Sequence, residues 1–157
     1  MWFSKKQVAK LPGFGARSSG TEAAGVAEPH GQITTKRLGD AAETLALAYL
    51  IQAGLLRVES NYRTPGRGGG EVDLIMRAPD GTLVFVEVRQ RKSNLHGGAA
   101  ASIGAVKRRR IIFAARYYLM RFASAPPCRF DVVLVQGRLD VPDTVAIEWL
   151  RGAFDAD

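Results

Sequence analysis

The sequence predicts a mixed α/β domain in which two helices pack against one mixed sheet. The prediction rests on the order of helix-like and strand-like segments, an αβββαβ core followed by one more short strand, which is typical of this class. The chain has 157 residues, a length that suits one domain of ordinary size. Hydrophobic residues make up 46% and charged residues 24%, close to the average of folded soluble proteins, and this excludes a wholly disordered chain.

Residues 1–33 show no regular spacing of apolar side chains and are rich in Gly, Ser, Ala and Pro. This composition predicts a disordered basic tail outside the fold. The folded domain is therefore expected to span residues 34–157.

The first helix is predicted over residues 36–53, where Ala and Leu dominate, with Thr35 as its cap and Gly54 as its stop. A second helix is predicted over residues 103–122 after a Gly-rich loop, with Ser102 as the candidate cap. The remaining segments are rich in apolar and β-branched residues and are bounded by Gly or Pro. They predict strands over residues 55–63, 71–77, 82–91, 129–135 and 144–150.

The turn between the second and third predicted strands decides which side chains face each other. A two-residue Asp-Gly turn would pair Pro79 with Thr82. A three-residue loop over residues 79–81 would pair Ala78 with Thr82 instead. The longer loop is favoured, because proline suits the first central position of a type I turn and glycine suits the left-handed residue that follows.

In this register Asp73 faces Glu87 directly and Glu71 faces Arg89, all on one face of the sheet. Opposed carboxylates repel, and if they are partly buried they must bind a cation or share a proton. Oxygen ligands of this kind suit Mg²⁺, Mn²⁺ or Ca²⁺. A solvated polar face with an ordinary Glu71–Arg89 ion pair is the alternative. The other face is expected to be the main core, made of Val72, Leu74, Met76, Val84, Val86 and Val88.

Glu43 is predicted to point toward the packed side of the first helix. Its neighbours at helical spacing, Gly39, Ala46, Leu47 and Leu50, are all apolar or lack a side chain. An inward carboxylate needs a cation or a hydrogen-bond donor. A buried pair with one of the many arginines is the alternative interpretation.

These acidic residues occur within motifs of a known superfamily. Glu43, the run EVDLI at 71–75 and the run VFVEVRQR at 84–91 resemble, in this order, the PD-(D/E)xK nuclease superfamily. More closely, the chain resembles the YraN family of small bacterial endonuclease-like proteins, relatives of archaeal Holliday-junction resolvases. The likeness covers residues 35 to about 150 and also includes Asn61-Tyr62-Arg63, Lys107 and Arg129-Phe130-Asp131.

The resemblance implies a restriction-endonuclease-like fold and a metal-dependent nuclease that hydrolyses phosphodiester bonds, with structured or branched DNA as its expected substrate. It implies that Glu43, Asp73 and Glu87 bind one or two Mg²⁺ or Mn²⁺ ions. These ions would polarise the phosphodiester and generate hydroxide from water.

Arg89 stands where the superfamily pattern has lysine, and the resemblance implies a catalytic role for it. Arginine keeps its proton, so it cannot act as a general base. It could hold the scissile phosphate or stabilise the charge of the transition state. Lys92, Lys107 and His96 are further candidates that the sequence does not place in the site.

The distribution of charge predicts a polyanionic partner. The net charge is +7, residues 33–131 alone carry +8, and 16 of the 22 basic residues are arginine, which suits phosphate. We expect a nucleic acid, DNA rather than RNA. A basic protein with no such partner is the alternative.

The candidate nucleic-acid-binding residues lie in the Gly-rich loop, at the end of a strand and along the second helix. Three of them, Arg108, Arg109 and Arg116, fall within about 100° around the helix axis and would form one stripe. No base-reading motif is present, so recognition of backbone and shape is expected. A solvated basic face is the alternative. The full set is Arg63, Arg67, Arg91, Lys107, Arg108, Arg109 and Arg116.

Two other functions are compatible with the sequence. One is a nucleic-acid-binding module that keeps a nuclease scaffold without cleavage, and the other is an interaction protein whose acids make structural ion pairs. A homodimer is left open.

The composition predicts a cytoplasmic protein with no membrane segment. No stretch approaches the roughly 18 uninterrupted apolar residues of a membrane helix, and the first 15 residues lack the apolar run of a secretion signal. Cys128 is the single cysteine and cannot form an internal disulfide, which fits a reducing compartment.

Overall fold

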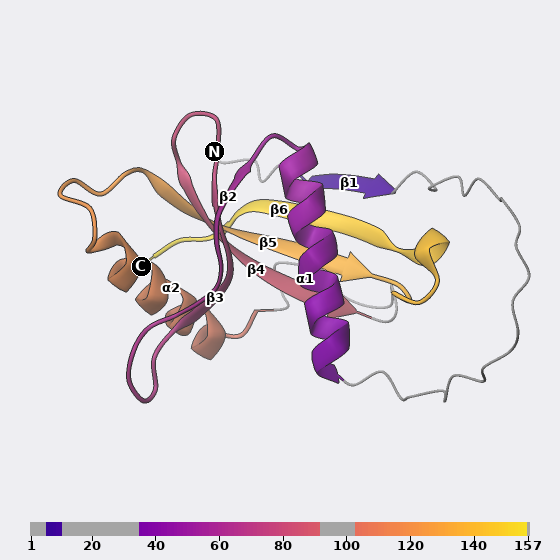
Figure 1. Cartoon of the computed structure of the whole chain (residues 1–157), viewed down its shortest axis with the longest axis horizontal. Helices are drawn as coiled ribbons and strands as arrows, with labels where there is room; N and C mark the ends of the chain where they lie inside the picture. Colours follow the sequence, from indigo (N-terminus) through magenta and orange to yellow (C-terminus); the bar gives the residue numbers. More distant parts are fainter. Residues whose placement is uncertain (1–5, 11–34, 92–102, 157) are drawn as a thin grey trace, which may run out of the picture.

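In the part of the chain that the structure describes, two helices cover opposite faces of a six-stranded mixed sheet (Figure 1). The structure is a computed structural model, and it describes residues 6–10, 35–91 and 103–156. The helices are α1 (Thr35–Gln52) and α2 (Ala105–Leu119), with a 3-10 turn at Pro142–Thr144. The strands are β1 (Lys6–Lys10), β2 (Leu56–Arg63), β3 (Glu71–Arg77), β4 (Leu83–Arg91), β5 (Cys128–Gln136) and β6 (Ala146–Phe154).

The order of the strands in the sheet is β1-β6-β5-β4-β3-β2. Strands β4 and β5 pair in parallel, whereas the other neighbouring strands pair antiparallel. A parallel pair needs a crossover, and the chain segment that contains α2 provides it. The mixed α/β domain predicted from the sequence is confirmed.

Both predicted helices are present, with small changes at their ends. Helix α1 ends at Gln52, one residue before its predicted end, and Gly54 follows with a φ of 95° and donates its N–H to the carbonyl of Ile51. Helix α2 is shorter than predicted and begins after Gly104, which provides no side-chain cap. Ser102, the expected cap, lies outside the described residues. Within the described residues, neither helix combines the length and hydropathy that a bilayer crossing requires.

The core lies on both faces of the sheet. Under α1, the predicted core side chains of β3 and β4 pack with Ala42, Ala46 and Leu50, and partly buried Val88 packs against them. Under α2, a second cluster contains Ile75, Phe85, Ile111 and Tyr118, so the face that carries the acids is also largely buried. The prediction fails for Val72. It pairs with Tyr62 beyond the end of the β3–β4 ladder and packs in the second cluster.

The N-terminal segment differs from the prediction of a tail outside the fold. Residues Lys6–Lys10 form β1, which pairs antiparallel with β6. Five residues are too few to show a periodic pattern, and main-chain bonds to an open strand edge depend little on side chains. The rest of the predicted tail lies outside the described residues.

Gly70 sets how closely α2 approaches the sheet. A Cβ atom at this position would overlap the carbonyl oxygen of Arg110 and lie 2.9 Å from the Cβ of Ala114. Backbone atoms of a packed helix cannot move aside cheaply. Only glycine therefore allows α2, at Arg110 and Ala114, to lie against the start of β3.

We predict that Gly70→Ala lowers the free energy of unfolding by about 2 kcal/mol or more, because it forces α2 away from the sheet. Gly39→Ala is the matched control, since Gly39 lies inside α1 with open space around it. That control should raise stability by about 0.5–1 kcal/mol. Urea denaturation of both variants measures the difference, and a Gly70→Ala protein as stable as wild type would contradict the close-approach argument.

Candidate functional site

The β3–β4 turn adopts the three-residue form predicted from the sequence. The N–H of Ala78 donates to the carbonyl of Thr82 at 2.9 Å, and Gly81 has a φ of 87°. Leu74 pairs with Val86 four positions further along the ladder. The predicted register is confirmed, and the two-residue turn is excluded.

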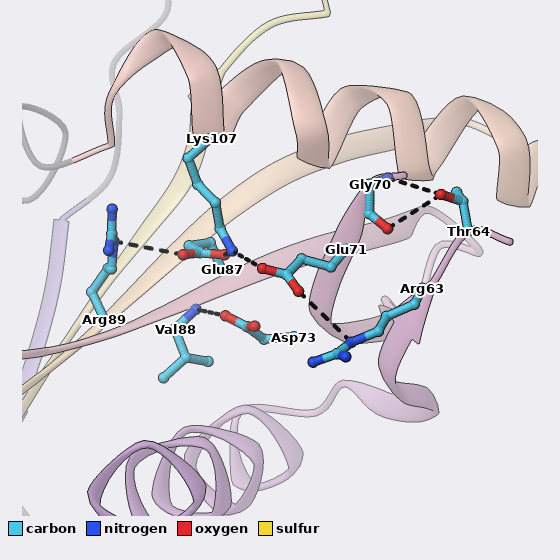
Figure 2. Close-up of polar contacts among 9 residues, drawn as sticks. All are labelled: Arg63, Thr64, Gly70, Glu71, Asp73, Glu87, Val88, Arg89 and Lys107. Atoms are coloured by element: carbon cyan, nitrogen blue, oxygen red, sulfur yellow. Dashed lines mark hydrogen bonds and ion pairs between the residues drawn. The ribbon is translucent and has the colours of Figure 1, made fainter. Parts of the chain in front are cut away.

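The ladder between β3 and β4 ends at Leu74 and Val86, and at this point Asp73 replaces main-chain pairing with a side-chain bond. Its Oδ2 accepts a hydrogen bond of 2.8 Å from the N–H of Val88 (Figure 2). Beyond this point β4 continues along β5, where Glu87 pairs with Val132. The carboxyl group of Asp73 thus lies where the two strands part.

Asp73 and Glu87 meet there, as predicted, and the negative charge of Asp73 helps to raise the pKa of the buried Glu87. The predicted placement of Glu71 opposite Arg89 is wrong, and so is the ion pair that the alternative interpretation put there, because the β3–β4 ladder has already ended. Glu71 instead pairs with Arg63 at 3.7 Å, and Arg89 pairs with Glu87 at 3.5 Å.

Lys107 links these acids to helix α2. Its Nζ lies 3.1 Å from Oε1 of Glu71 and 3.2 Å from Oε2 of Glu87, so one ammonium contacts two carboxylates (Figure 2). The side chain of Glu87 is 3% exposed and that of Lys107 is 23% exposed. The sequence left the position of Lys107 open, and the packing of α2 against Gly70, at Arg110 and Ala114, brings it into the site.

The electrostatics of the cluster follow from burial and from like charges. Burial, and then the negative charge of Asp73, raise the pKa of Glu87 to about 8. Burial acts to lower the pKa of Lys107, but the carboxylates of Glu87 and Glu71 outweigh it and raise that pKa above its usual range. The hydrogen bond from Lys107 lowers the pKa of Glu71. Lys107 is therefore an ammonium group at neutral pH.

Glu43 approaches the same acids from α1. It is half-buried, and its polar neighbour is the side-chain amide of Asn61, which acts to lower its pKa, rather than an arginine. Burial, and then the charge of Asp73, raise the pKa of Glu43. Among the described residues, no three acidic, histidine or cysteine side chains form a group close enough to hold a metal ion. The three predicted metal ligands, Glu43, Asp73 and Glu87, are thus neighbours, but they do not converge closely enough to form a metal site as they stand.

Asn61 is a site residue that the sequence motif contained but whose role we did not predict. It is the one non-glycine residue among those described with a left-handed backbone, with a φ of 54° in β2. Asparagine tolerates this conformation better than most residues. An isolated Asn within a strand-like segment is the feature of the sequence that could have indicated this left-handed backbone.

Two of the predicted basic residues lie where β2 leads into β3, and one of them, Arg63, pairs with Glu71. Arg63 and Arg67 are exposed at the β2–β3 loop, whose ends are joined by a 2.8 Å hydrogen bond from the Gly70 N–H to Oγ1 of Thr64. Arg110, which was not among the predicted residues, also lowers the pKa of Glu71 through its charge. Arg63 and Arg110 thus form a basic border beside Glu71.

The predicted arginine stripe on α2 is only partly correct. Arg109 and Arg116 are exposed. Arg108 is partly buried, donates to the carbonyl of Ile103 at 3.1 Å and lies over the ring of Phe154. It lies at the margin of the packed arc of the helix, so it has a structural contact that the helical angle alone did not reveal.

The other predicted residues lie away from these contacts or outside the described chain. Arg91 is half-buried at the end of β4 and pairs in the ladder with Gln136. Lys92 and His96 lie outside the described residues.

Comparison with known sequences decides the family. The family model described as "Uncharacterised protein family UPF0102" matches residues 42–135, a span that begins beside Glu43 and ends in β5. The chain belongs to this family. The family expected from the sequence motifs, YraN, is therefore confirmed.

UPF0102 proteins of several bacteria are similar to this chain. One from Polaromonas naphthalenivorans (strain CJ2) is 64% identical, and the match covers 99% of both chains. One from Polaromonas sp. (strain JS666 / ATCC BAA-500) is 63% identical, again over 99% of both. One from Albidiferax ferrireducens is 63% identical over 78% of this chain and 91% of the relative. These names state a family and no activity.

The raised pKa of Glu87 predicts how stability depends on pH in metal-free buffer. The folded state holds a proton on Glu87 that the unfolded state releases near its ordinary pKa of 4.5. This contribution to the free energy of unfolding is complete below pH 4.5 and is lost as the pH rises to about 8. Its size is a few kcal/mol at most, since one pKa unit corresponds to about 1.4 kcal/mol.

Urea denaturation at several pH values between 4.5 and 8 measures this slope. Glu87→Gln should flatten it, whereas Asp80→Asn, on the exposed turn of the same hairpin, should leave it unchanged. A Glu87→Gln protein with the wild-type slope would show that another group takes up the proton.

Proposed function

We propose that this protein is a metal-dependent nuclease with a restriction-endonuclease-like fold that hydrolyses phosphodiester bonds in structured or branched DNA. The observation that carries the proposal is the pair of half-buried Asp73 and buried Glu87, with the ammonium of Lys107 beside Glu87. Two carboxylates and a lysine are the residue types of the PD-(D/E)xK pattern. Here the lysine comes from α2, while Arg89 occupies the motif position.

The fold is consistent with this proposal. A mixed sheet with a helix on each face, and with acids at the point where two central strands part, is the arrangement that the resemblance implies. The family and the mixed α/β class are established, and the superfamily fold is part of the proposal.

The two carboxyl groups fit a divalent ion. Asp73 and Glu87 offer hard oxygen donors, and burial, together with the negative charge of Asp73, raises the pKa of Glu87 to about 8. Mg²⁺ is commonly bound by one or two protein carboxylates, with water and phosphate at its other positions. Glu43, which lies close enough for the charge of Asp73 to raise its pKa, would be the third acid.

A bound divalent ion would place positive charge on the scissile phosphate and lower the pKa of a water molecule. Lys107 would donate hydrogen bonds to phosphate oxygens and stabilise the negative charge that develops there. Its raised pKa keeps it protonated, so it is not the general base. Arg89 adds a second positive group on the other side of Glu87, and Glu71 holds Lys107 in position.

A nucleic-acid-binding module without cleavage is the second candidate. It is favoured by Lys107, which partly neutralises Glu87 with no metal, and by Arg89 at the motif position of lysine. Such a protein would bind DNA through the same basic border and would not need a divalent ion.

We predict that Mg²⁺ or Mn²⁺ raises the melting temperature of the wild type by mass action. Asp73→Asn should lose most of this gain and all cleavage of branched DNA. Without metal it should be at least as stable as wild type, because the mutual repulsion with Glu87 is removed. The amide oxygen can still accept the hydrogen bond from Val88, so the strands should part as before.

Asp80→Asn is the matched control, because it makes the same chemical change on the exposed turn of the same hairpin. Its melting temperature should still rise when Mg²⁺ or Mn²⁺ is added. A wild type that does not respond to metal, together with an Asp73→Asn protein that is less stable in metal-free buffer, would indicate a structural ion cluster. A metal-dependent rise in melting temperature without cleavage of any DNA structure would favour the nucleic-acid-binding module.

A further inference from the structure

The outward face of α2 carries an apolar stripe that the fold does not use. At 100° per residue its four members fall within about 60° around the helix axis, and their exposed fractions range from 42% to 77%. The opposite face of the helix provides the packing, through Ile111, Ala114, Ala115 and Tyr118. The outer stripe consists of Val106, Phe113, Tyr117 and Met120.

Positive charge borders the outer stripe on both sides. By helical geometry, Arg109 and Arg116 lie along one side and Arg110 lies along the other. Residues 105–122 contain no acidic residue. A molecule that covers this face must therefore be negatively charged and must also present apolar or aromatic surfaces.

The basic surface continues from the outer stripe to the acids. The stripe begins at Val106, next to Lys107 in the first turn of α2. Gly70, at the base of the β2–β3 loop, contacts the backbone of Arg110, so the loop that carries Arg67 lies beside the helix. One strand of a polyanion could therefore run from the acid cluster over the first turn of α2 and along the outer stripe.

We propose that the outer stripe binds the unpaired bases of single-stranded nucleic acid. Phe113 and Tyr117 stack on bases, while the arginines on both sides contact phosphates. The two rings are separated by about 6 Å along the helix axis, four residues at 1.5 Å each. Neighbouring bases in a duplex rise only about 3.4 Å. The spacing therefore suits a strand whose bases are unstacked.

This inference rests on the proposed nuclease function and makes it more specific. It implies that the DNA substrate has a single-stranded arm next to the phosphodiester bond that is cut. The observations favour nucleic acid over two other occupants. A second copy of the chain that packed through the same face would bring its own arginines against the arginines beside the outer stripe, and these like charges would repel. A flat anionic membrane would not account for the basic surface that continues to the acid cluster.

Binding of a fluorescent 30-nucleotide single strand and of its duplex, in metal-free buffer with the full chain, tests the proposal. In the double variant Phe113→Ala/Tyr117→Ala, the Kd for the single strand should rise about tenfold or more, because alanine removes both stacking partners. The Kd for the duplex should change less than twofold. Phe113→Trp/Tyr117→Trp should keep the single-strand affinity, since the stacking surface remains.

Ile51→Ala/Leu56→Ala is the matched control, because it removes two equally exposed apolar side chains away from α2, and it should change neither Kd. Equal losses for single strand and duplex, or no loss, would overturn the proposal. So would an alanine variant that loses only binding to anionic vesicles, or that only dissociates a dimer in light scattering. Because no metal is present, this result is independent of the metal test on Asp73, and either proposal can fail while the other stands.

Discussion

The ammonium group of Lys107 is the contact on which the arrangement of this site depends. Glu87 is almost fully buried next to half-buried Asp73, and a buried carboxylate without compensation is strongly unfavourable. Lys107 compensates it from a different layer of the fold, and its second partner, Glu71, fixes it there. The same contact therefore ties α2 to β3 and β4 and sets the charge of the acid cluster. It depends in turn on Gly70, which lets the helix come close enough.

The acid cluster is costly for the fold, and this is the reason to assign a function to it. A hydrophobic side chain at Glu87 would continue the core that Phe85 forms on the same face of β4. Instead β3 and β4 separate, and the carboxylate of Asp73 accepts a hydrogen bond from the N–H of Val88. The pKa of Glu87 is raised to about 8. Groups with strongly shifted pKa values and specific charged partners concentrate at functional sites. The border of arginines and the exposed aromatic side chains on α2 give the same site a surface that suits nucleic acid.

Local chemistry made part of this structure predictable. Proline and glycine at residues 79–81 determine the turn, and the turn determines the register that brings Asp73 to Glu87. Gly54 similarly marks the end of α1. The family followed from short motifs in a fixed order. These features depend on residues close together in the chain, so the sequence contains the information that defines them.

Features that depend on contacts between distant segments were missed or wrong. Lys107 enters the site because α2 packs on Gly70, and Arg108 turns inward because β6 presents Phe154. The strands β3 and β4 separate where the side chain of Asp73 accepts a hydrogen bond from the N–H of Val88. Because of this separation, Glu71 does not face Arg89 as predicted. The most direct test of the whole account is anomalous diffraction from crystals soaked in Mn²⁺. The account predicts a manganese peak bonded to Asp73 and Glu87, with Nζ of Lys107 still on Glu71. No peak at these carboxylates, with Lys107 still bridging Glu71 and Glu87, would contradict it.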